Sequence, residues 1–157
     1  MATTNAAEEL KKSKEAYRAN THLNVDIRLS TILDLTFNED DSHKEGRISL
    51  TVVADGAVIS GSVVSEDVWA ENQAKAMETN SEGFANALRM LQDAAIEGRK
   101  TRNAEVEKTG EHRAFRTKIH FEKATVITGG TNIVTTGLRV DLKHVSAWTL
   151  GEMAAQN

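Results

Sequence analysis

Catalysis by this chain would have to use histidine, carboxylate or hydroxyl side chains. The sequence has five histidines and no cysteine, which excludes thiolate nucleophiles, disulfides and thiolate metal ligands. His112 and His120 are eight residues apart, a spacing that no metal motif requires, and His120 and His144 are predicted to lie on the surface. No G-x-S-x-G, P-loop or G-x-G-x-x-G pattern is present, and no carboxylate has a context that predicts desolvation. We therefore predict no catalytic residue, no metal site and no cofactor, and rank an enzyme last among the possible functions.

Two charged clusters are candidates for binding ions or nucleic acid. The acidic loop, residues 38–46, lacks the Asp-x-Asp spacing and the terminal glutamate of an EF-hand, so we predict a solvated loop. The basic cluster consists of Arg99, Lys100, Arg102, His112, Arg113, Arg116 and Lys118. Glutamates interleave with these cations and no exposed aromatic side chain is expected beside them, which weakens phosphate attraction and base stacking. With a net charge of −4 as well, the sequence does not favour nucleic-acid binding.

The stretch 47–65, RISLTVVADGAVISGSVVS, predicts a β-hairpin around which the rest of the chain is organised. The Asp55-Gly56 pair lies between two β-branched runs and is a strong signal for a two-residue type I′ turn. The apolar residues of the two arms then share one face: Ile48, Leu50, Val52, Ile59 and Val63. Val53 and Val58 pair on the other face, among Ser and Thr side chains, and are our candidate interaction surface. The alternative is that another segment of the same chain covers them.

Helices are predicted on both sides of this hairpin. Residues 23–29 alternate between apolar and polar side chains, which favours a strand, and a short helix is predicted from Ser30 onward. Ser65 is the predicted N-cap of a helix after the hairpin, and Ser81 caps a second helix that ends at Gly98. An apolar stripe on this second helix is either core or an interface: Phe84, Leu88, Leu91 and Ala95.

The chain of 157 residues is predicted to form one domain behind an N-terminal arm. Residues 1–20 are polar and helix-prone but carry few apolar side chains, so we predict a flexible or helical arm. Residues 21–157 are assigned to a single α+β domain with a charged linker near residues 99–112. Two strand-rich segments close the domain, with a turn or bulge near His144 where the alternation changes phase. The sequence shows neither an apolar leader segment nor a run of membrane-spanning length, which predicts a cytoplasmic protein without membrane insertion.

The hairpin and its continuation, ISLTVVADGAVISGSVVSEDVW, resemble the first strands of the Sm-like small β-barrel. In this resemblance the segments FEKATVITGG and GLRVDLKHVSAW would supply that barrel's remaining strands. This resemblance implies an α+β fold with a small antiparallel, barrel-like sheet of about five strands (Sm-like/SH3-like). A short helix would precede the central hairpin and a long helical insertion would follow it. The Asp-x-x-x-Asn loop and Arg-Gly turn with which Sm proteins contact RNA are not matched, so an Sm-like RNA-binding module is the alternative function.

A second resemblance is closer. The segments RISLTVVADGAVISGSVVSEDVW and GLRVDLKHVSAWTLGEM resemble the bacterial gas vesicle accessory protein U family, with the run from Gly56 to Ser65 as the best match. Membership would imply a cytoplasmic, non-enzymatic accessory protein, rather than a shell subunit, that acts on the assembly or clustering of gas vesicles. The implied partners are further copies of the chain and the gas vesicle shell or other gas vesicle proteins.

Overall fold

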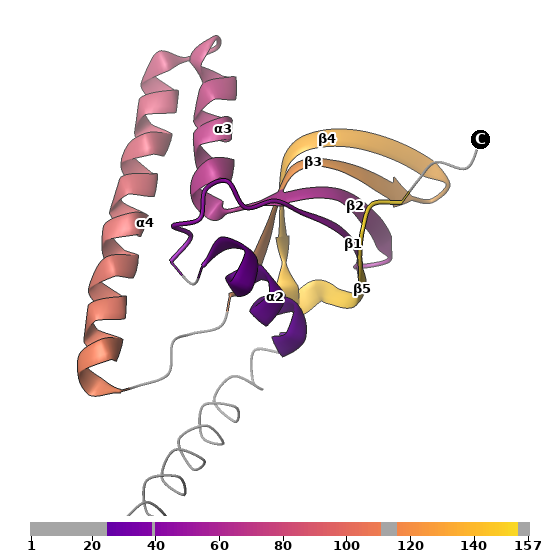
Figure 1. The fold of residues 1–157 in the computed structure, drawn as a ribbon. Helices are drawn as coiled ribbons and strands as arrows, with labels where there is room; N and C mark the ends of the chain where they lie inside the picture. Colours follow the sequence, from indigo (N-terminus) through magenta and orange to yellow (C-terminus); the bar gives the residue numbers. More distant parts are fainter. Residues whose placement is uncertain (1–24, 39, 111–115, 154–157) are drawn as a thin grey trace, which may run out of the picture.

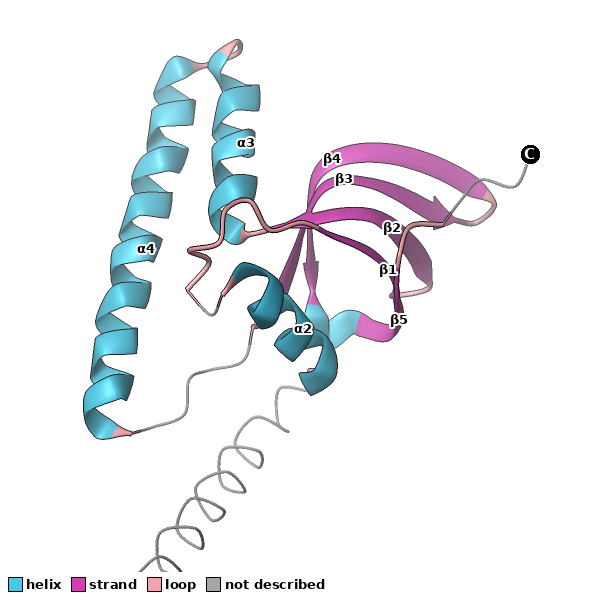
Figure 2. Ribbon diagram, viewed as in Figure 1, coloured by secondary structure: helices cyan, strands magenta, loops and turns pink. Residues whose placement is uncertain are grey.

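The computed structural model describes residues 25–38, 40–110 and 116–153, so the predicted arm of residues 1–20 lies outside the described residues. The elements follow in this order: α2 (Ile27–Phe37), β1 (Ile48–Ala54), β2 (Ala57–Val64), α3 (Glu66–Glu78), α4 (Glu82–Thr109), β3 (Lys118–Thr128), β4 (Thr131–Asp141), η1 (Leu142–His144) and β5 (Val145–Leu150). Figures 1 and 2 show the sheet with α2 against it and a hairpin of α3 and α4 that projects to one side.

The five strands form one antiparallel sheet in the order β4-β3-β2-β1-β5. This confirms an α+β fold with five antiparallel strands, a short helix before the central hairpin and a long helical insertion after it. β4 and β5 are the two edges of the sheet, and in the described part of the chain they do not pair with each other. Closure of the sheet into a barrel is therefore not shown.

The central hairpin has the predicted turn and the predicted register. Val52 lies opposite Ile59, as the two-residue loop requires. Asp55 and Gly56 have φ angles of 48° and 80°, which are the left-handed values that a type I′ turn needs at both positions. The predicted inner face is buried at Leu50, Val52, Ile59 and Val63 and partly buried at Ile48.

α2 covers the inner face of the sheet and completes the core. Its Leu29, Leu33 and Phe37 are at most 1% exposed. They pack against ten buried residues of the strands and η1: Leu50, Val52, Ala54, Ile59, Val63, Ile119, Phe121, Ala124, Val140 and Leu142. We call the opposite side of the sheet, which α2 does not cover, the outer face.

α2 begins earlier than the sequence pattern predicted. Asp26 caps it by accepting hydrogen bonds from the N–H groups of Arg28 at 2.9 Å and Leu29 at 3.1 Å. A hydrogen bond from Trp148 Nε1 to Asp26 Oδ2, 2.8 Å long, lowers the pKa of Asp26 and fastens β5 to this helix end. Residues 27–29 are therefore helical, and the predicted strand is wrong there. A short alternation of apolar and polar residues fits either a strand or a helix. Here the Asp26 cap and the burial of Leu29 and Leu33, four residues apart, favour the helix.

α3 and α4 begin where predicted, because Ser65 and Ser81 accept hydrogen bonds from N–H groups in the first turns of these helices. Among their described residues, only Ala74 and Ala85 are buried. Two arginines of α4 bind carboxylates of α3: Arg99 with Glu66 and Asp67, and Arg89 with Glu71 and Glu78. The contact between the two helices therefore depends more on charge than on an apolar core.

The predicted end of the second helix at Gly98 is wrong, because α4 continues to Thr109 and is capped by Gly110. Residues 99–109 of the predicted charged linker are thus helical. An interior glycine costs a helix only about 1 kcal/mol, and the Lys, Arg, Glu and Ala residues that follow are strong helix formers.

The strands after the helices are longer than the alternation indicated, with 11 residues each in β3 and β4. η1 separates β4 from β5 and confirms the irregularity predicted near His144. β3 approaches β2 closely at Gly61, where a Cβ atom would lie 2.1 Å from the carbonyl oxygen of Lys123. Glycine is the one residue that permits this approach.

Candidate interaction surfaces

Val53 and Val58, the predicted interaction surface, lie side by side on the outer face of the sheet. They are cross-strand partners, and the strand register extends the row to Ile127 on β3 and Ala147 on β5. We call these four residues the outer row. Val53, Val58 and Ile127 are partly buried and Ala147 is exposed. Sequence reasoning missed Ile127 and Ala147 because the alternation within a strand does not show which strands become neighbours.

The next pair on the outer face, Thr51 and Ser60, is buried by the chain itself. Their hydroxyl oxygens are 2.8 Å apart, and Thr51 Oγ1 donates to the carbonyl oxygen of Gly151 at 2.8 Å. The N–H of Met153 donates to Ser60 Oγ at 2.7 Å. Residues 151–153 therefore cross the outer face at this pair, two residues farther from the hairpin turn than Val53 and Val58.

The predicted stripe on α4 lies mostly outside the core of the described chain. Phe84 is 54% exposed and Leu91 is 69% exposed. Ala95 is also exposed, and only Leu88 is partly buried. Met90, which the predicted stripe did not include, is 72% exposed. These residues thus leave an apolar side of α4 open.

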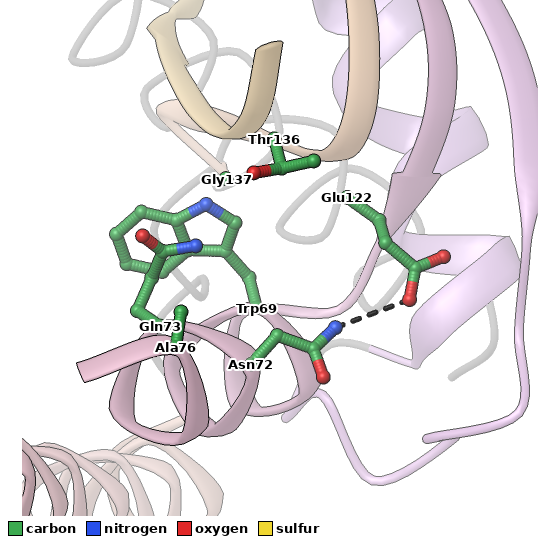
Figure 3. A pocket seen from close by; sticks show the side chains of 7 residues that line it. All are labelled: Trp69, Asn72, Gln73, Ala76, Glu122, Thr136 and Gly137. Atoms are coloured by element: carbon green, nitrogen blue, oxygen red, sulfur yellow. Dashed lines mark hydrogen bonds between the residues drawn. The ribbon is translucent and has the colours of Figure 1, made fainter. Parts of the chain in front are cut away.

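A pocket of about 270 Å³ lies where α3 meets β3 and β4 (Figure 3). It is lined by Trp69, Asn72, Gln73, Ala76, Glu122, Thr136 and Gly137. Asn72 Nδ2 donates to Glu122 Oε1 at 3.1 Å (Figure 3), and the Gln73 amide lies against Gly137, where a Cβ atom would be 1.8 Å from Gln73 Nε2. Because polar groups of its lining bind each other, we interpret this pocket as part of the attachment of α3 to the sheet.

His120 is buried, so the prediction that it lies on the surface is wrong. It is 2% exposed, and its ring centroid is 5.2 Å from that of Trp69 on α3. Burial, with repulsion from Arg139 as the next cause, lowers the pKa of His120 to about 3. The alternation of His120 with Ile119 and Phe121 puts His120 on the outer face, but it does not show that Trp69 covers this residue. His144 is exposed as predicted, and His112 lies outside the described residues.

We expect the protein to lose stability in acid through His120. Because the pKa is about 3 in the folded chain and about 6.5 in an unfolded chain, only the unfolded state binds the proton between these values. The contribution of neutral His120 to the free energy of unfolding is therefore fully present above about pH 6.5 and is lost as the pH falls toward 3. Between pH 7.5 and pH 5, this residue should lower the free energy of unfolding by about 2 kcal/mol.

Urea unfolding at both pH values measures this loss. The variant His120→Gln has no titrating group there and should lack the 2 kcal/mol component of the decrease, to within about 0.5 kcal/mol. Equal decreases in the wild type and in His120→Gln would contradict a buried neutral imidazole.

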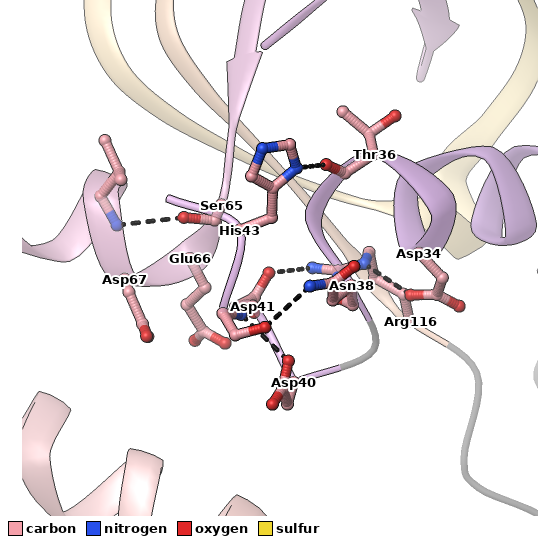
Figure 4. Close-up of polar contacts among 12 residues, drawn as sticks. Asp34, Thr36, Asn38, Asp40, Asp41, His43, Ser65, Glu66, Asp67 and Arg116 are labelled. Carbon is pink, nitrogen blue, oxygen red and sulfur yellow. Dashed lines mark hydrogen bonds and ion pairs between the residues drawn. The ribbon is translucent and has the colours of Figure 1, made fainter. Parts of the chain in front are cut away.

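Arg116 joins the start of β3 to α2 and the acidic loop (Figure 4). Its side chain is 10% exposed, and it binds Asp34 Oδ1 at 3.0 Å and Asp41 Oδ1 at 2.8 Å. It also donates to the carbonyl oxygen of Asn38 at 3.1 Å. Asp41 is 3% exposed, so the prediction of a solvated loop is wrong at this residue. Burial raises the pKa of Asp41, and the Arg116 charge opposes that rise.

The basic cluster does not form one positive surface in the described part of the chain. Four of its members are paired with carboxylates from several elements: Arg99 with Glu66 and Asp67, Lys100 with Glu97, Arg116 with Asp34 and Asp41, and Lys118 with Asp141. Arg102 donates to the carbonyl oxygen of Gly98 at 3.3 Å. His112 and Arg113 lie outside the described residues. Pairing reduces the positive potential that phosphate binding needs, and the RNA-binding alternative has no support from these residues.

Metal binding and membrane crossing can be assessed only where side chains are described. Within residues 25–38, 40–110 and 116–153, no three His, Cys, Asp or Glu side chains group so that they could hold a metal ion. None of the helices in these ranges combines the length and the apolar content that crossing a membrane requires.

Comparison with known families supports the second of the two resemblances. The family model described as "Gas vesicle protein GvpU-like" matches residues 26–153. The chain belongs to this family. No curated protein and no solved structure matches the chain.

The GvpU-like match takes in every surface described above. It begins at Asp26, the N-cap of α2, and ends at Met153, which binds Ser60 on the outer face. The sheet, α2 and both helices of the hairpin all lie within it. The resemblance seen in the central hairpin and the C-terminal segment therefore extends over α3, α4 and β3 as well.

Proposed function

We propose that this GvpU-like protein is a non-enzymatic, cytoplasmic accessory protein that regulates gas vesicle assembly or clustering. It acts through self-association and through binding to gas vesicle components. The observation that carries this proposal is the family match over residues 26–153, which assigns the chain to gas vesicle proteins. The same match supports association with gas vesicles.

Two separate apolar surfaces support a bridging role. The outer row lies on the sheet, whereas the exposed residues Phe84, Met90 and Leu91 lie on α4, which α3 separates from the sheet (Figure 1). A protein that brings vesicles together needs one surface for a vesicle and another for a second copy. Once one contact has formed, the other forms at high effective concentration, so two weak contacts together can bind strongly. The chain has a candidate for each.

The outer row is our proposed contact with a gas vesicle component or another copy. Complete burial of Val53 and Val58 contributes about 2–4 kcal/mol before the costs of association. Both side chains are already partly buried, so the gain on binding lies toward the lower end of this range. Such a contact is reversible unless several copies act together.

Flotation tests the proposal, since buoyant vesicles carry bound protein upward during centrifugation. The wild-type protein should rise with purified vesicles, and Val53→Thr/Val58→Thr should weaken its binding or its self-association about tenfold. Threonine keeps the β-branched shape, so the sheet should remain folded. Val134→Thr, at an exposed position outside the outer row, is the matched control and should behave as the wild type.

Light scattering on the same proteins separates the two kinds of contact. A lower mass for Val53→Thr/Val58→Thr places the outer row in self-association, and a lost flotation at unchanged mass places it in vesicle binding. Unchanged mass and unchanged flotation contradict a role for the outer row. A wild-type protein that neither floats with vesicles nor clusters them contradicts the proposed function, and a steep salt dependence in RNA filter binding would support the Sm-like alternative instead.

A further inference from the structure

The exposed side of α4 carries a regular apolar seam. Phe84, Ala87, Leu91 and Ala94 are spaced by three, four and three residues, which is the spacing of a helix that packs along another helix. Phe84 and Leu91 are 54% and 69% exposed, and both alanines are exposed. We call these four residues the α4 seam. α3 covers a different side of α4, on which Ala85 is buried.

The neighbours of the α4 seam are also apolar. Leu88 flanks it on one side and Met90, which is 72% exposed, on the other. Two polar residues of this stretch face α3: Arg89 Nε donates to Glu71 at 3.1 Å and Gln92 donates to Asp67 at 2.6 Å. Asn86 and Asp93 are exposed on a side of α4 that points away from the seam. A partner can therefore bury the seam without removing an unpaired charge from water, which is the main cost of burying helix surfaces.

We propose that two copies of the chain associate through the α4 seam, with their α4 helices antiparallel. This proposal rests on the self-association part of the proposed function and names its surface. In a two-fold pair centred on residue 89, Phe84 lies opposite Ala94 of the second copy, and Ala87 lies opposite Leu91 of the second copy. Every layer then combines one large and one small side chain, as close packing requires.

In the same antiparallel pair centred on residue 89, each residue that flanks the seam meets the same residue of the second copy. Met90 faces Met90 of the second copy along one flank, and Leu88 faces its own counterpart along the other flank. A parallel pair would instead place Phe84 against Phe84 and Ala87 against Ala87, which overfills one layer and leaves the next one empty. The alternation of large and small residues along the seam thus selects the antiparallel direction.

The size of this contact predicts weak and reversible association. Large apolar side chains such as these have roughly 200 Å² of surface each, so the exposed parts of Phe84, Met90 and Leu91 amount to roughly 400 Å² per copy. With Leu88 and the alanines, two copies bury about 1,000 Å², which is at the lower limit for a specific interface. Such a pair forms and dissociates with protein concentration. Because the seam lies on α4 and the outer row on the sheet, the contact does not use the outer row of either copy.

Association is tested first with a charge in the seam. Leu91→Glu places a carboxylate at the contact and should weaken self-association at least tenfold in analytical ultracentrifugation over a range of concentrations. Leu35→Glu on α2 is the matched control, because Leu35 is 79% exposed and lies outside the seam. It should associate as the wild type does, and both variants should keep the wild-type circular dichroism. A wild-type protein that is monomeric at all concentrations, or equal effects of the two variants, would overturn the proposal.

The direction of the pair is tested by cross-linking, for which the absence of cysteine from the chain is convenient. Met90→Cys and its counterpart are offset by only about 3 Å along the antiparallel axis and should form a disulfide-linked dimer under mild oxidation. Ala94→Cys is offset from its counterpart by about 15 Å and should remain monomeric under the same conditions. A dimer from Ala94→Cys but not from Met90→Cys would show a parallel pair and overturn the proposal.

Vesicle clustering separates failure of this inference from failure of the proposed function. If the wild-type protein clusters vesicles and Leu91→Glu clusters them equally well with unchanged self-association, the function stands and the α4 seam is wrong. If Met90→Cys forms dimers but the wild-type protein neither binds nor clusters vesicles, the seam stands and the function is wrong. If residues 1–24 cover the seam, the protein should be a monomer that associates only after this segment is removed. That result would also overturn the proposal.

Discussion

Arg116→Met should lower the free energy of unfolding by about 3–5 kcal/mol in urea at pH 7. Methionine keeps the length and the apolar stem of the side chain but removes the charge that Asp34 and Asp41 share. Asp41 is 3% exposed and would remain as a buried carboxylate without its ion pair. Loss of one partner from a buried pair is expensive because the other charge has neither water nor a counter-ion.

Two further variants determine whether this loss comes from the buried charge. Arg47→Met removes an ion pair with Glu122 whose side chains are 44% and 38% exposed, and it should cost less than about 1 kcal/mol. Adding Asp41→Asn to Arg116→Met removes the unpaired charge and should recover at least about 1 kcal/mol. A loss below about 1 kcal/mol for Arg116→Met, or no recovery in the double variant, would show that Asp41 is effectively solvated.

Gly61→Ala should have an effect of similar or greater size, about 3 kcal/mol or more. The new Cβ atom would lie 2.1 Å from the carbonyl oxygen of Lys123 and 2.8 Å from the Cα atom of Ala124. Both atoms belong to the backbone of β3, so no side chain can rotate away, and β2 and β3 must separate. Gly61 pairs with Leu50 and Ala124, which are both buried, and the separation therefore opens the core.

Gly83→Ala is the matched control for this prediction. Gly83 lies in the first turn of α4, and a Cβ atom there would meet nothing within 4 Å. Alanine should therefore raise the free energy of unfolding by up to about 1 kcal/mol, because it is the better helix former. In urea unfolding, the two variants should therefore change the free energy of unfolding in opposite directions. A change of less than about 1 kcal/mol for Gly61→Ala would mean that the two strands are not held this closely in solution.

Local chemistry made the central part of the fold predictable. The Asp55-Gly56 turn and the alternation around it determine which residue faces which over the whole of β1 and β2. The caps at Ser65 and Ser81 are also local signals, since each satisfies N–H groups within one helical turn. The family resemblance came from this same stretch, and the match to residues 26–153 confirms it.

The parts that could not be predicted depend on residues far apart in the sequence. Arg116 and Asp41 are 75 residues apart, so nothing near Asp41 signals its burial. His120 alternates like any half-exposed strand residue, and nothing near it in the sequence indicates that Trp69, on a helix inserted between β2 and β3, packs against it. The outer row could not be predicted for the same reason, because Ile127 and Ala147 become neighbours of Val53 and Val58 only through the order of the strands in the sheet.

The insertion of α3 and α4 between β2 and β3 has a mechanical consequence. Val64 at the end of β2 pairs with His120 near the start of β3, so the chain leaves the sheet and returns to it between the same two neighbouring strands. The length of the helices is thus not fixed by strand pairing. α4 has 28 residues and is about 42 Å long, so each added or deleted pair of turns would move its far end by about 10 Å. The hairpin is therefore a spacer whose reach can change while the body that carries it folds unaltered.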